Sequence, residues 1–334
     1  MILLTGGLGY IGSHMAAWLL AQQQPIVIVD NLSNSERSVL DTLESWYQQS
    51  IPFYPIDVTD RQALAQVFAA HAIDAVIHFA ALKSVNESVS QPMAYYQNNV
   101  VGTLSLIQTM QQFAVRRIVF SSTAAVYGAP ESLPVTEDAH VAPTNPYGHS
   151  KWMSEQMLRD VAHSESDWQI AILRYFNPVG AHPSARIGEN PRGTPANLMP
   201  YVAQVAAGWR PALQVFGQDY PTLDGTGVRD YIHIMDLVDA HATVLAWLSQ
   251  QPAACATFNV GCGHGYSVLE MIKAFERVTG QAVPYQIHAR RAGDIAEIYA
   301  DPQQFEQATG WRATRGLDEM VADLWRFQQT QSAV

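Results

Sequence analysis

The sequence predicts an α/β fold: a doubly wound parallel sheet forms the first domain, and a smaller C-terminal α/β domain follows it. Three observations support this prediction. Short runs rich in β-branched residues alternate with helical stretches through the first half of the 334 residues, a glycine-rich loop follows the first run, and the composition changes after Pro178. Strand–helix repetition of this kind builds right-handed crossovers and therefore a parallel sheet.

Six apolar runs are expected to form buried strands of the first domain. They do not alternate between apolar and polar residues, which is typical of strands covered by helices on both faces. The runs are Ile2–Thr5, Ile26–Asp30, Phe53–Asp57, Ala75–Phe79, Arg117–Ser121 and Gln169–Arg174. The helices expected between them are His14–Gln22, Arg61–Ala70, Met93–Phe113 and Tyr147–His163.

The second half of the chain has a different composition. Residues 183–200 are rich in Gly, Pro and Asn, which indicates an irregular segment shaped around a ligand. We expect domains at 1–176 and 177–334, with a segment at about 229–260 that returns to the first, and a ligand-binding cleft between them. The helices expected in this half are Asp236–Ser249, Val268–Thr279 and Leu317–Gln328.

Charge and cysteine content exclude several classes of protein. The formal net charge of −11 argues against a nucleic-acid or membrane-surface partner, because such partners require a basic face. The two cysteines, Cys255 and Cys262, form no CxxC pair, and no HExxH motif is present, so we expect neither a metal site nor a disulfide framework. No apolar stretch is long enough for a signal peptide or a membrane span. We therefore expect a soluble cytoplasmic protein.

The first strand is followed by a loop with glycines at positions 6, 9 and 12. Such glycines allow a tight turn and a close approach of the backbone to a pyrophosphate, which then lies at a helix N-terminus, as in Rossmann folds. Asp30 ends the second strand, where a carboxylate accepts both hydroxyls of a ribose and repels a 2′-phosphate. The loop therefore predicts a dinucleotide site for NAD rather than NADP.

Tyr147 and Lys151 are four residues apart in a predicted helix and project from one face. A free tyrosine has a pKa near 10, and a neighbouring cation favours its phenolate form, as does the positive nicotinamide of NAD. Thr123 follows the fifth strand, at the sheet edge where doubly wound folds bind ligands. This pattern predicts a tyrosine base that oxidises a secondary alcohol, with the Thr123 hydroxyl against a substrate oxygen.

The motifs together resemble the extended short-chain dehydrogenase/reductase family and, within it and from end to end, the UDP-glucose 4-epimerases. They are Thr5-Gly6-Gly7-Leu8-Gly9-Tyr10-Ile11-Gly12, Asp30-Asn31-Leu32, Tyr147-x-x-x-Lys151, Arg174-Tyr175-Phe176-Asn177, Asn197-Leu198-Met199-Pro200, Gly227-Val228-Arg229-Asp230-Tyr231-Ile232-His233 and Arg290-Arg291-x-Gly293-Asp294. Two positions depart from the pattern of many relatives. His149 replaces lysine or alanine and is expected to face away from Tyr147, and Thr123 replaces serine but keeps the hydroxyl.

The resemblance implies a set of binding residues. Those expected around NAD are Gly6, Gly9, Tyr10, Ile11, Gly12, Asp30, Asn31, Leu32, Ser33, Asn34, Ser35, Asp57, Val58, Phe79, Ala80, Ala81, Leu82, Lys83, Asn98, Thr123, Tyr147, Lys151 and Phe176. Those expected around a UDP-sugar are Thr123, Tyr147, Asn177, Asn197, Gln214, Val215, Phe216, Arg229, Arg291, Asp294 and Ile298. Independently of the resemblance, Arg229 and Arg291 are suitable cations for a diphosphate in an acidic protein.

The resemblance also bears on the reaction. Related dehydratases and decarboxylases place acidic residues after the threonine of the fifth strand, where this chain has Ala124 and Ala125. A 4-keto intermediate then has no local route to elimination, so we expect C4 epimerisation of UDP-glucose and UDP-galactose. Two alternatives stay open: an epimerase acting on N-acetylated UDP-sugars, alone or in addition, and a non-catalytic NAD-sensing binding protein. The apolar helices Met93–Phe113 and Tyr147–His163, which pair across a two-fold axis in similar proteins, suggest a homodimer.

Overall fold

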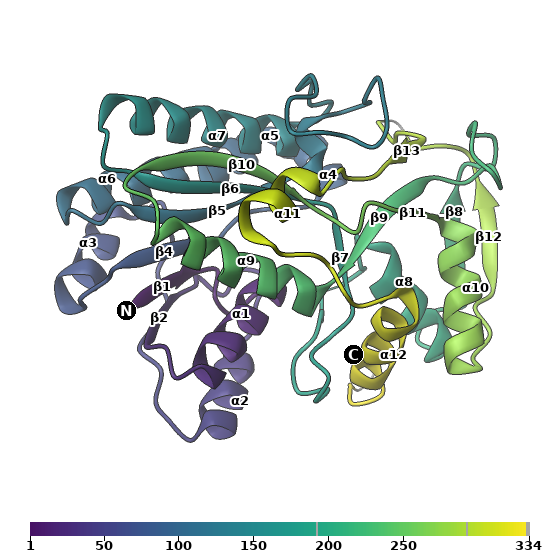
Figure 1. Cartoon of the computed structure of the whole chain (residues 1–334). Coiled ribbons are helices and arrows are strands. Elements are labelled where there is room, and N and C mark those ends of the chain that lie inside the picture. Colours follow the sequence, from purple (N-terminus) through teal and green to yellow (C-terminus); the bar gives the residue numbers. More distant parts are fainter. Residues whose placement is uncertain (192, 292, 332–334) are drawn as a thin grey trace. The chain divides into compact units, whose positions relative to one another are not determined.

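A computed structural model describes residues 1–191, 193–291 and 293–331 of the chain (Figure 1). The chain forms two compact units. The first unit comprises Met1–Val126, Val141–Arg174 and Val238–Phe258, and the second comprises Tyr127–His140, Tyr175–Leu237 and Asn259–Val334.

A seven-stranded sheet with the order β10-β6-β5-β4-β1-β2-β3 forms the centre of the first unit. β1 pairs in parallel with both β2 and β4, so that Thr5 lies between Val29 and His78 at the end of the three strands. The strands are β1 (Ile2–Thr5), β2 (Ile26–Val29), β3 (Phe53–Tyr54), β4 (Ala75–His78), β5 (Arg117–Thr123), β6 (Gln169–Tyr175) and β10 (Ala254–Val260). The predicted doubly wound α/β fold is confirmed.

Helices cover both faces of this sheet, with α7 on one side and α1 on the other (Figure 1). Buried aliphatic side chains of the strands, such as Leu3, Val76 and Ile118, pack against Leu106 and Leu158 of these helices. The helices are α1 (Tyr10–Ala21), α2 (Arg37–Tyr47), α3 (Arg61–Ala70), α4 (Val85–Ser90), α5 (Pro92–Tyr95), the π-helix η1 (Tyr96–Val101), α6 (Gly102–Gln112), the 3₁₀-helix η2 (Ala124–Val126), α7 (Pro146–Ser164) and α9 (Ile234–Leu248).

The second unit contains two small sheets. In the larger one, β9 pairs with β7, β11 and β13, and in the smaller one β8 pairs in parallel with β12. The strands are β7 (Asn177–Val179), β8 (Leu213–Phe216), β9 (Val228–His233), β11 (Gly265–Ser267), β12 (Tyr285–His288) and β13 (Glu297–Ile298). The helices are α8 (Leu198–Ala206), α10 (Val268–Thr279), α11 (Gln303–Thr309) and α12 (Leu317–Gln328).

Several predicted elements coincide with the structure and others do not. The strand Ile2–Thr5 and the helices Arg61–Ala70, Val268–Thr279 and Leu317–Gln328 have the predicted limits. The predicted helix Met93–Phe113 corresponds to an unbroken helical stretch in which the π-helix η1 lies between α5 and α6. The sequence analysis did not predict α2, α4, α8 and α11, which are helices in the structure.

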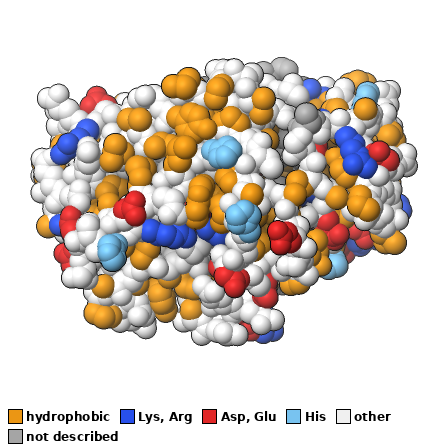
Figure 2. Space-filling view, turned by 90° about the horizontal axis from the view of Figure 1, so that it is seen from above, with side chains coloured by type: hydrophobic (Ala, Val, Ile, Leu, Met, Phe, Trp, Pro, Cys, Tyr) orange, Lys and Arg blue, Asp and Glu red, His pale blue; other side chains and the backbone are white. Residues whose placement is uncertain are grey.

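The face of the first unit formed by α4 to α7 exposes large apolar side chains. Val89 is 65% exposed, Met93 75%, Leu104 41% and Met153 45%. Figure 2 shows hydrophobic side chains gathered on the face that carries α7. None of the described helices is long and apolar enough to span a bilayer.

Candidate active site

The glycine loop of the first unit is built so that side chains are excluded from it. Gly6 has a φ of +66°, and a Cβ at this position would lie 2.7 Å from the Ala80 nitrogen. A Cβ on Gly12 would lie 2.2 Å from the Gly6 carbonyl oxygen. These contacts explain why glycine is required where the loop turns into α1.

The first backbone N–H groups of α1 precede the first hydrogen bond within the helix. Gly9 precedes the helix and provides no side-chain cap. The hydrogen bond from the Ser13 N–H to the Gly9 carbonyl is the first of the helix, at 2.9 Å, so the N–H groups of Tyr10, Ile11 and Gly12 come before it. Glycines at positions 6 and 12 that leave no room for a Cβ, followed by the first N–H groups of a helix, fit the pyrophosphate of a dinucleotide.

Asp30 organises the end of β2. One of its oxygens accepts a hydrogen bond from the Leu8 N–H at 3.0 Å, and the other accepts from the Leu32 N–H at 2.9 Å and the Ser35 hydroxyl at 2.7 Å. Leu32 has a φ of +59°, a conformation that costs energy for a branched side chain and that the hydrogen bond to Asp30 holds. The carboxylate therefore ties the segment 31–35 to the glycine loop.

A hydrogen bond joins the segment after β3 to Asn31 of the 31–35 segment. Its amide donates to Asp57 at 2.9 Å, and Thr59 donates to the other oxygen of that carboxylate at 2.7 Å through its hydroxyl. Although burial raises it, these hydrogen bonds hold the pKa of Asp57 below its usual value. Val58, the neighbour predicted to meet the adenine, is buried.

Asn99, the neighbour of the predicted Asn98, links segments around the candidate site through its side chain. Its amide oxygen accepts from the Leu82 N–H at 2.9 Å, and its amide nitrogen donates to the Leu82 carbonyl at 3.0 Å and to the Ser150 hydroxyl at 2.9 Å. Asn98 donates to the same amide oxygen at 2.9 Å. Asn99 thus connects the loop after β4, where Phe79, Ala80, Ala81, Leu82 and Lys83 lie, to α7.

The start of α7 is fixed by local signals. The Asn145 side chain accepts a hydrogen bond from the Gly148 N–H at 2.9 Å, and Pro146 occupies the first helical position. A Cβ on Gly148 would lie 2.8 Å from the Ala125 carbonyl oxygen, so glycine allows the helix to pack closely on η2. This packing brings Tyr147 next to the end of β5.

Thr123 and Tyr147 meet at the carboxyl end of β5. The Ala125 N–H donates to the Thr123 hydroxyl oxygen at 3.1 Å, which leaves the hydroxyl hydrogen available to another acceptor. Burial raises the pKa of the Tyr147 phenol, and its hydrogen bond with Thr123 lowers it. The Tyr95 ring packs edge-on against the Tyr147 ring, with centroids 6.4 Å apart.

Lys151 is 3% exposed, and its ammonium donates to the Ser121 carbonyl at 2.8 Å and lies 4.9 Å from the centre of the Phe120 ring. Burial lowers the pKa of Lys151 to about 7, and Glu155 opposes this shift. His149, between Tyr147 and Lys151, is exposed. Tyr147, Lys151 and Thr123 are therefore brought together at one edge of the sheet, as the sequence analysis expected of them.

His78, at the end of β4, belongs to a chain of hydrogen bonds behind this edge. Its Nδ1 lies 2.6 Å from the Thr5 hydroxyl, and its Nε2 lies 3.2 Å from the Thr103 hydroxyl. Because Thr103 donates to the Asn99 carbonyl at 2.6 Å, its oxygen accepts from Nε2, and Thr5 must donate to Nδ1. Burial, reinforced by Lys151, lowers the pKa of His78 to about 3, so the ring is neutral.

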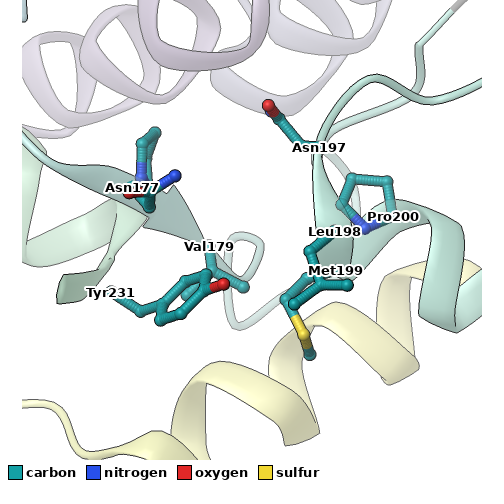
Figure 3. Close-up of a pocket in the computed structure, with 8 residues that line it drawn as sticks. Asn177, Val179, Asn197, Leu198, Met199, Pro200 and Tyr231 are labelled. Carbon is teal, nitrogen blue, oxygen red and sulfur yellow. The ribbon is translucent and has the colours of Figure 1, made fainter. Parts of the chain in front are cut away.

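A pocket in the second unit collects two of the residues predicted to bind the sugar nucleotide. It is lined by Asn177, Pro178, Val179, Asn197, Leu198, Met199, Pro200 and Tyr231. Asn177 and Tyr231 are directly opposed on the paired strands β7 and β9, and the Tyr231 hydroxyl points toward the 197–200 segment (Figure 3). The Asn197 amide donates to Glu189 at 2.7 Å. The sequence analysis did not name Tyr231 as a site residue, although its motif contains it.

Arg229 and Ile298 are neighbours in the larger sheet of this unit. The register of β9 and β13 places them opposite each other, and Ile298 is buried. The Arg229 guanidinium donates to the Ile295 carbonyl at 2.9 Å and to the Val228 carbonyl at 2.8 Å. Burial lowers the pKa of Arg229, and Tyr231 and Asp294 oppose this shift.

Arg291 forms a second group with an aromatic ring and a carboxylate. Its guanidinium lies 4.7 Å from the centre of the Phe216 ring and donates to Asp294 at 2.9 Å. In β8, which carries Phe216, Gln214 is exposed and Val215 is buried. The adjacent Arg290 repeats the arrangement with Tyr220 and Asp219, 4.1 Å from the ring centre and 2.7 Å from the carboxylate.

Phe176, predicted to meet NAD, is buried within the second unit.

The chain is similar to known proteins over nearly its whole length. The family model for GDP-mannose 4,6 dehydratase matches residues 3–324. The UDP-glucose 4-epimerase of Bacillus subtilis (strain 168) is 54% identical over 329 residues, which cover 98% of this chain and 97% of that protein.

Solved structures give the same result. The UDP-glucose-4-epimerase from Stenotrophomonas maltophila, with bound NAD and formylated UDP-arabinopyranose, has a TM-score of 0.95 and 50% identity, covering 98% of this chain and 97% of that one. The UDP-glucose 4-epimerase from Bifidobacterium longum, in complex with NAD+ and UDP, has a TM-score of 0.95 and 47% identity, with 98% of each chain covered. The similarity therefore includes both units of the chain.

Proposed function

Because this chain belongs to the family of UDP-glucose 4-epimerases, we propose that it interconverts UDP-glucose and UDP-galactose at C4 with tightly bound NAD. The observation that carries the proposal is the group of Tyr147, Lys151 and Thr123 at the carboxyl end of β5. This function belongs to galactose metabolism.

The first unit would hold NAD. The glycine loop and the first N–H groups of α1 would bind the pyrophosphate, and Asp30 would accept hydrogen bonds from the ribose of the adenosine. Asn31 to Ser35, Asp57 and Val58 would surround the adenosine, and the segment 79–83, Asn98 and Lys151 would line the nicotinamide half. NAD held there would supply a reversible hydride acceptor for C4 of the sugar.

The residues of this chain would move the proton and hold the sugar nucleotide. Tyr147 would remove the proton from the 4-hydroxyl as a phenolate, and the Lys151 ammonium would favour that form. Thr123, whose hydroxyl oxygen accepts from the Ala125 N–H, would donate its hydroxyl hydrogen to the substrate oxygen in place of Tyr147. Arg229 and Arg291 would pair with the diphosphate, and Asn177, Asn197, Phe216 and Asp294 would position the rest of the nucleotide.

Dehydration is the second reaction to consider, because the matching family model is that of a dehydratase. Elimination needs an acid near the 4-keto intermediate to protonate the leaving group. The two residues after Thr123 are Ala124 and Ala125, whose methyl groups cannot transfer protons. Epimerisation is therefore favoured over elimination. A non-catalytic NAD-sensing role is disfavoured because it would require neither Tyr147 nor Lys151.

We expect Tyr147→Phe to lower the epimerisation rate by roughly 10²–10⁴-fold, the usual contribution of a positioned acid–base group. UDP-sugar binding should survive, because the ring stays in place. The measurement is the kcat for UDP-galactose with product analysis, beside UDP binding by calorimetry. Tyr95→Phe is the matched control, since it removes the hydroxyl of the ring that packs on Tyr147. Near-normal turnover by Tyr147→Phe would refute the assignment.

We expect the purified protein to retain NAD. The catalytic cycle returns the hydride, so no net oxidation drives exchange of the cofactor. Denaturation should release nearly stoichiometric NAD(H) and no NADP(H), and the enzyme should convert UDP-galactose with no cofactor added. Strict dependence on added cofactor, with none released, would contradict this expectation.

Ile298 would decide how well N-acetylated sugars are accepted. In similar enzymes the corresponding side chain borders the 2-substituent of the hexose, and here Ile298 is buried beside Arg229. A β-branched side chain has little χ1 freedom to move aside. Crowding an acetamido group against it should cost about 1–3 kcal/mol, which makes the N-acetyl pair the slower one by roughly 10–200-fold.

Ile298→Cys should narrow this difference, and Ile298→Tyr should widen it. The measurement is kcat/KM for the plain and the N-acetylated UDP-hexoses with all three proteins. Ile272→Cys, a buried position of α10, controls for a general loss of stability. Equal ratios in the three proteins would show that position 298 does not determine the selectivity, and a faster N-acetyl pair would favour the alternative epimerase.

A homodimer is proposed through the face formed by α4 to α7. Met93, Leu104 and Met153 are exposed there, whereas Leu106 and Ile107 belong to the core of the first unit. Light scattering at micromolar concentration should give twice the monomer mass, because an apolar face of this kind is stabilised by burial against a partner. Met93→Glu combined with Met153→Glu should shift the mass to that of a monomer. A monomeric mass for the unaltered protein would remove the proposal.

We also propose a cytoplasmic location. Both cysteines are free in the structure, and Cys255 is exposed, which suits a reducing compartment. A soluble nucleotide-sugar substrate is compatible with that compartment.

A further inference from the structure

The carboxylate of Glu155 is buried one helical turn after Lys151 on α7, and both oxygens have donors. Arg174 of β6 donates to it through Nε at 3.0 Å and through Nη2 at 2.7 Å. Ser122 of β5 donates its hydroxyl to the same carboxylate. The side chain of Glu155 is fully buried and that of Arg174 is 2% exposed. Glu155 therefore joins α7 to two strands of the sheet.

These contacts reach the catalytic group through neighbouring residues on β5. Ser121, whose carbonyl accepts from Lys151, precedes Ser122, and Thr123 follows it. Lys151 and Glu155 are four residues apart, so they lie on one face of α7. The carboxylate is the negative charge that opposes the loss of the Lys151 proton caused by burial.

We propose that Glu155 is a positioning residue for the Tyr147–Lys151 pair: its carboxylate fixes α7 against the end of β5 and places a negative charge one helical turn from Lys151. Its relevance to catalysis rests on the epimerase activity proposed above, whereas its effect on the charge of Lys151 does not. Arg174 orients this carboxylate and partly neutralises its negative charge.

Other titratable groups lie around Glu155 and Lys151. Arg159, one turn further along α7, is partly exposed and donates to Glu155 at 3.2 Å and to Thr257 of β10 at 2.7 Å. Burial raises the pKa of Cys255, also on β10, so its thiol is neutral near pH 7. On the side of Lys151, His78 is neutral, and burial raises the pKa of Tyr147. Glu155 is the carboxylate that raises the pKa of Lys151 against the effect of burial.

The experiment uses the small number of lysines. The chain has three, Lys83, Lys151 and Lys273, so lysine isotopically labelled at Cε gives three signals, and Lys151→Arg assigns one of them. The position of the Lys151 signal against pH reports its protonation in the folded holoenzyme, without any need for turnover. kcat against pH is recorded for the same proteins.

We expect Glu155→Gln to move the Lys151 titration to lower pH by about one unit, because the counter-charge is lost and Arg174 remains. Arg174→Met should move it to higher pH, because the carboxylate is then less neutralised. The double variant Glu155→Met with Arg174→Met should titrate between the two single variants. The kcat at neutral pH should fall most in Glu155→Gln.

Two controls keep the test decisive. Glu165→Gln removes a glutamate–arginine pair at the far end of the same helix, with Arg116 at 3.2 Å, and should leave the Lys151 titration unchanged. Breaking a buried pair on one side can prevent folding, whereas replacing both partners by apolar residues is often tolerated. If Glu155→Gln does not fold, the double variant must still titrate at lower pH than Arg174→Met.

The proposal is overturned if the Lys151 signal titrates at the same pH in all folded variants, or if Glu155→Gln and Arg174→Met shift it in the same direction. Loss of stability alone, with the titration unmoved, would show a merely structural role. If the titrations shift in opposite directions but the protein does not epimerise UDP-sugars, the proposed function fails and the role of Glu155 in setting the charge of Lys151 stands.

Discussion

The burial of the Lys151 ammonium is the constraint on which the first unit depends. A cation in an apolar interior is stable only when its donors find acceptors and a negative charge lies near. The Ser121 carbonyl accepts one hydrogen bond from Lys151, and the Phe120 ring lies under the ammonium. Both come from the end of β5, so the position of this strand relative to α7 determines whether Lys151 is charged. Gly148 sets that position by allowing α7 to pack on η2.

Buried carboxylates also need hydrogen-bond partners, and here backbone N–H groups as well as cations supply them. Asp230 in the second unit accepts from the N–H groups of Cys262, Gly263 and Ala300 at 2.9 to 3.2 Å. Burial nevertheless raises the pKa of Asp230 to about 6, because these donors only partly replace water. The carboxylate fixes the chain next to β13, which carries Ile298. In both units, buried charges position the segments proposed to touch ligands.

Much of the fold could be predicted from the sequence because its signals are local. The helix Val268–Thr279 begins with a capping box of Ser267 and Glu270 and ends at Gly280 with a positive φ. By contrast, α2 begins after Glu36 without a side-chain cap, so no local signal marks its start. In α8, Pro200 lies in the first turn of the helix. A proline in a Gly- and Asn-rich stretch predicts an irregular segment, so the sequence did not indicate this helix. The π-helix within Met93–Phe113 has no periodicity that would reveal it, although its residue Asn99 makes tertiary hydrogen bonds.

Some residues of the candidate site could likewise be predicted from the sequence, and others could not. Tyr147 and Lys151 could be identified because their spacing on one helix is itself the chemical signal. Asn99 and Glu155 could not, because their partners, Leu82 in one case and Ser122 and Arg174 in the other, are distant in sequence and meet them only in the folded unit. An Asn next to a named Asn, or a Glu one turn after a named Lys, carries no meaning until those partners are known.

Arg229 shows why the diphosphate cation and the wall of the sugar pocket cannot be treated as separate parts. Its guanidinium holds the carbonyl of Ile295, three residues before Ile298, and the strand pairing of β9 with β13 places Ile298 opposite Arg229 itself. A guanidinium has five donors in a fixed plane, so those that bind the backbone restrict the direction of those left for a phosphate. A change in the backbone at 295–298 would therefore turn the donors of Arg229 as well as move the side chain at 298. We therefore expect the proposed selectivity for the sugar and the proposed affinity for the diphosphate to be coupled through this one side chain.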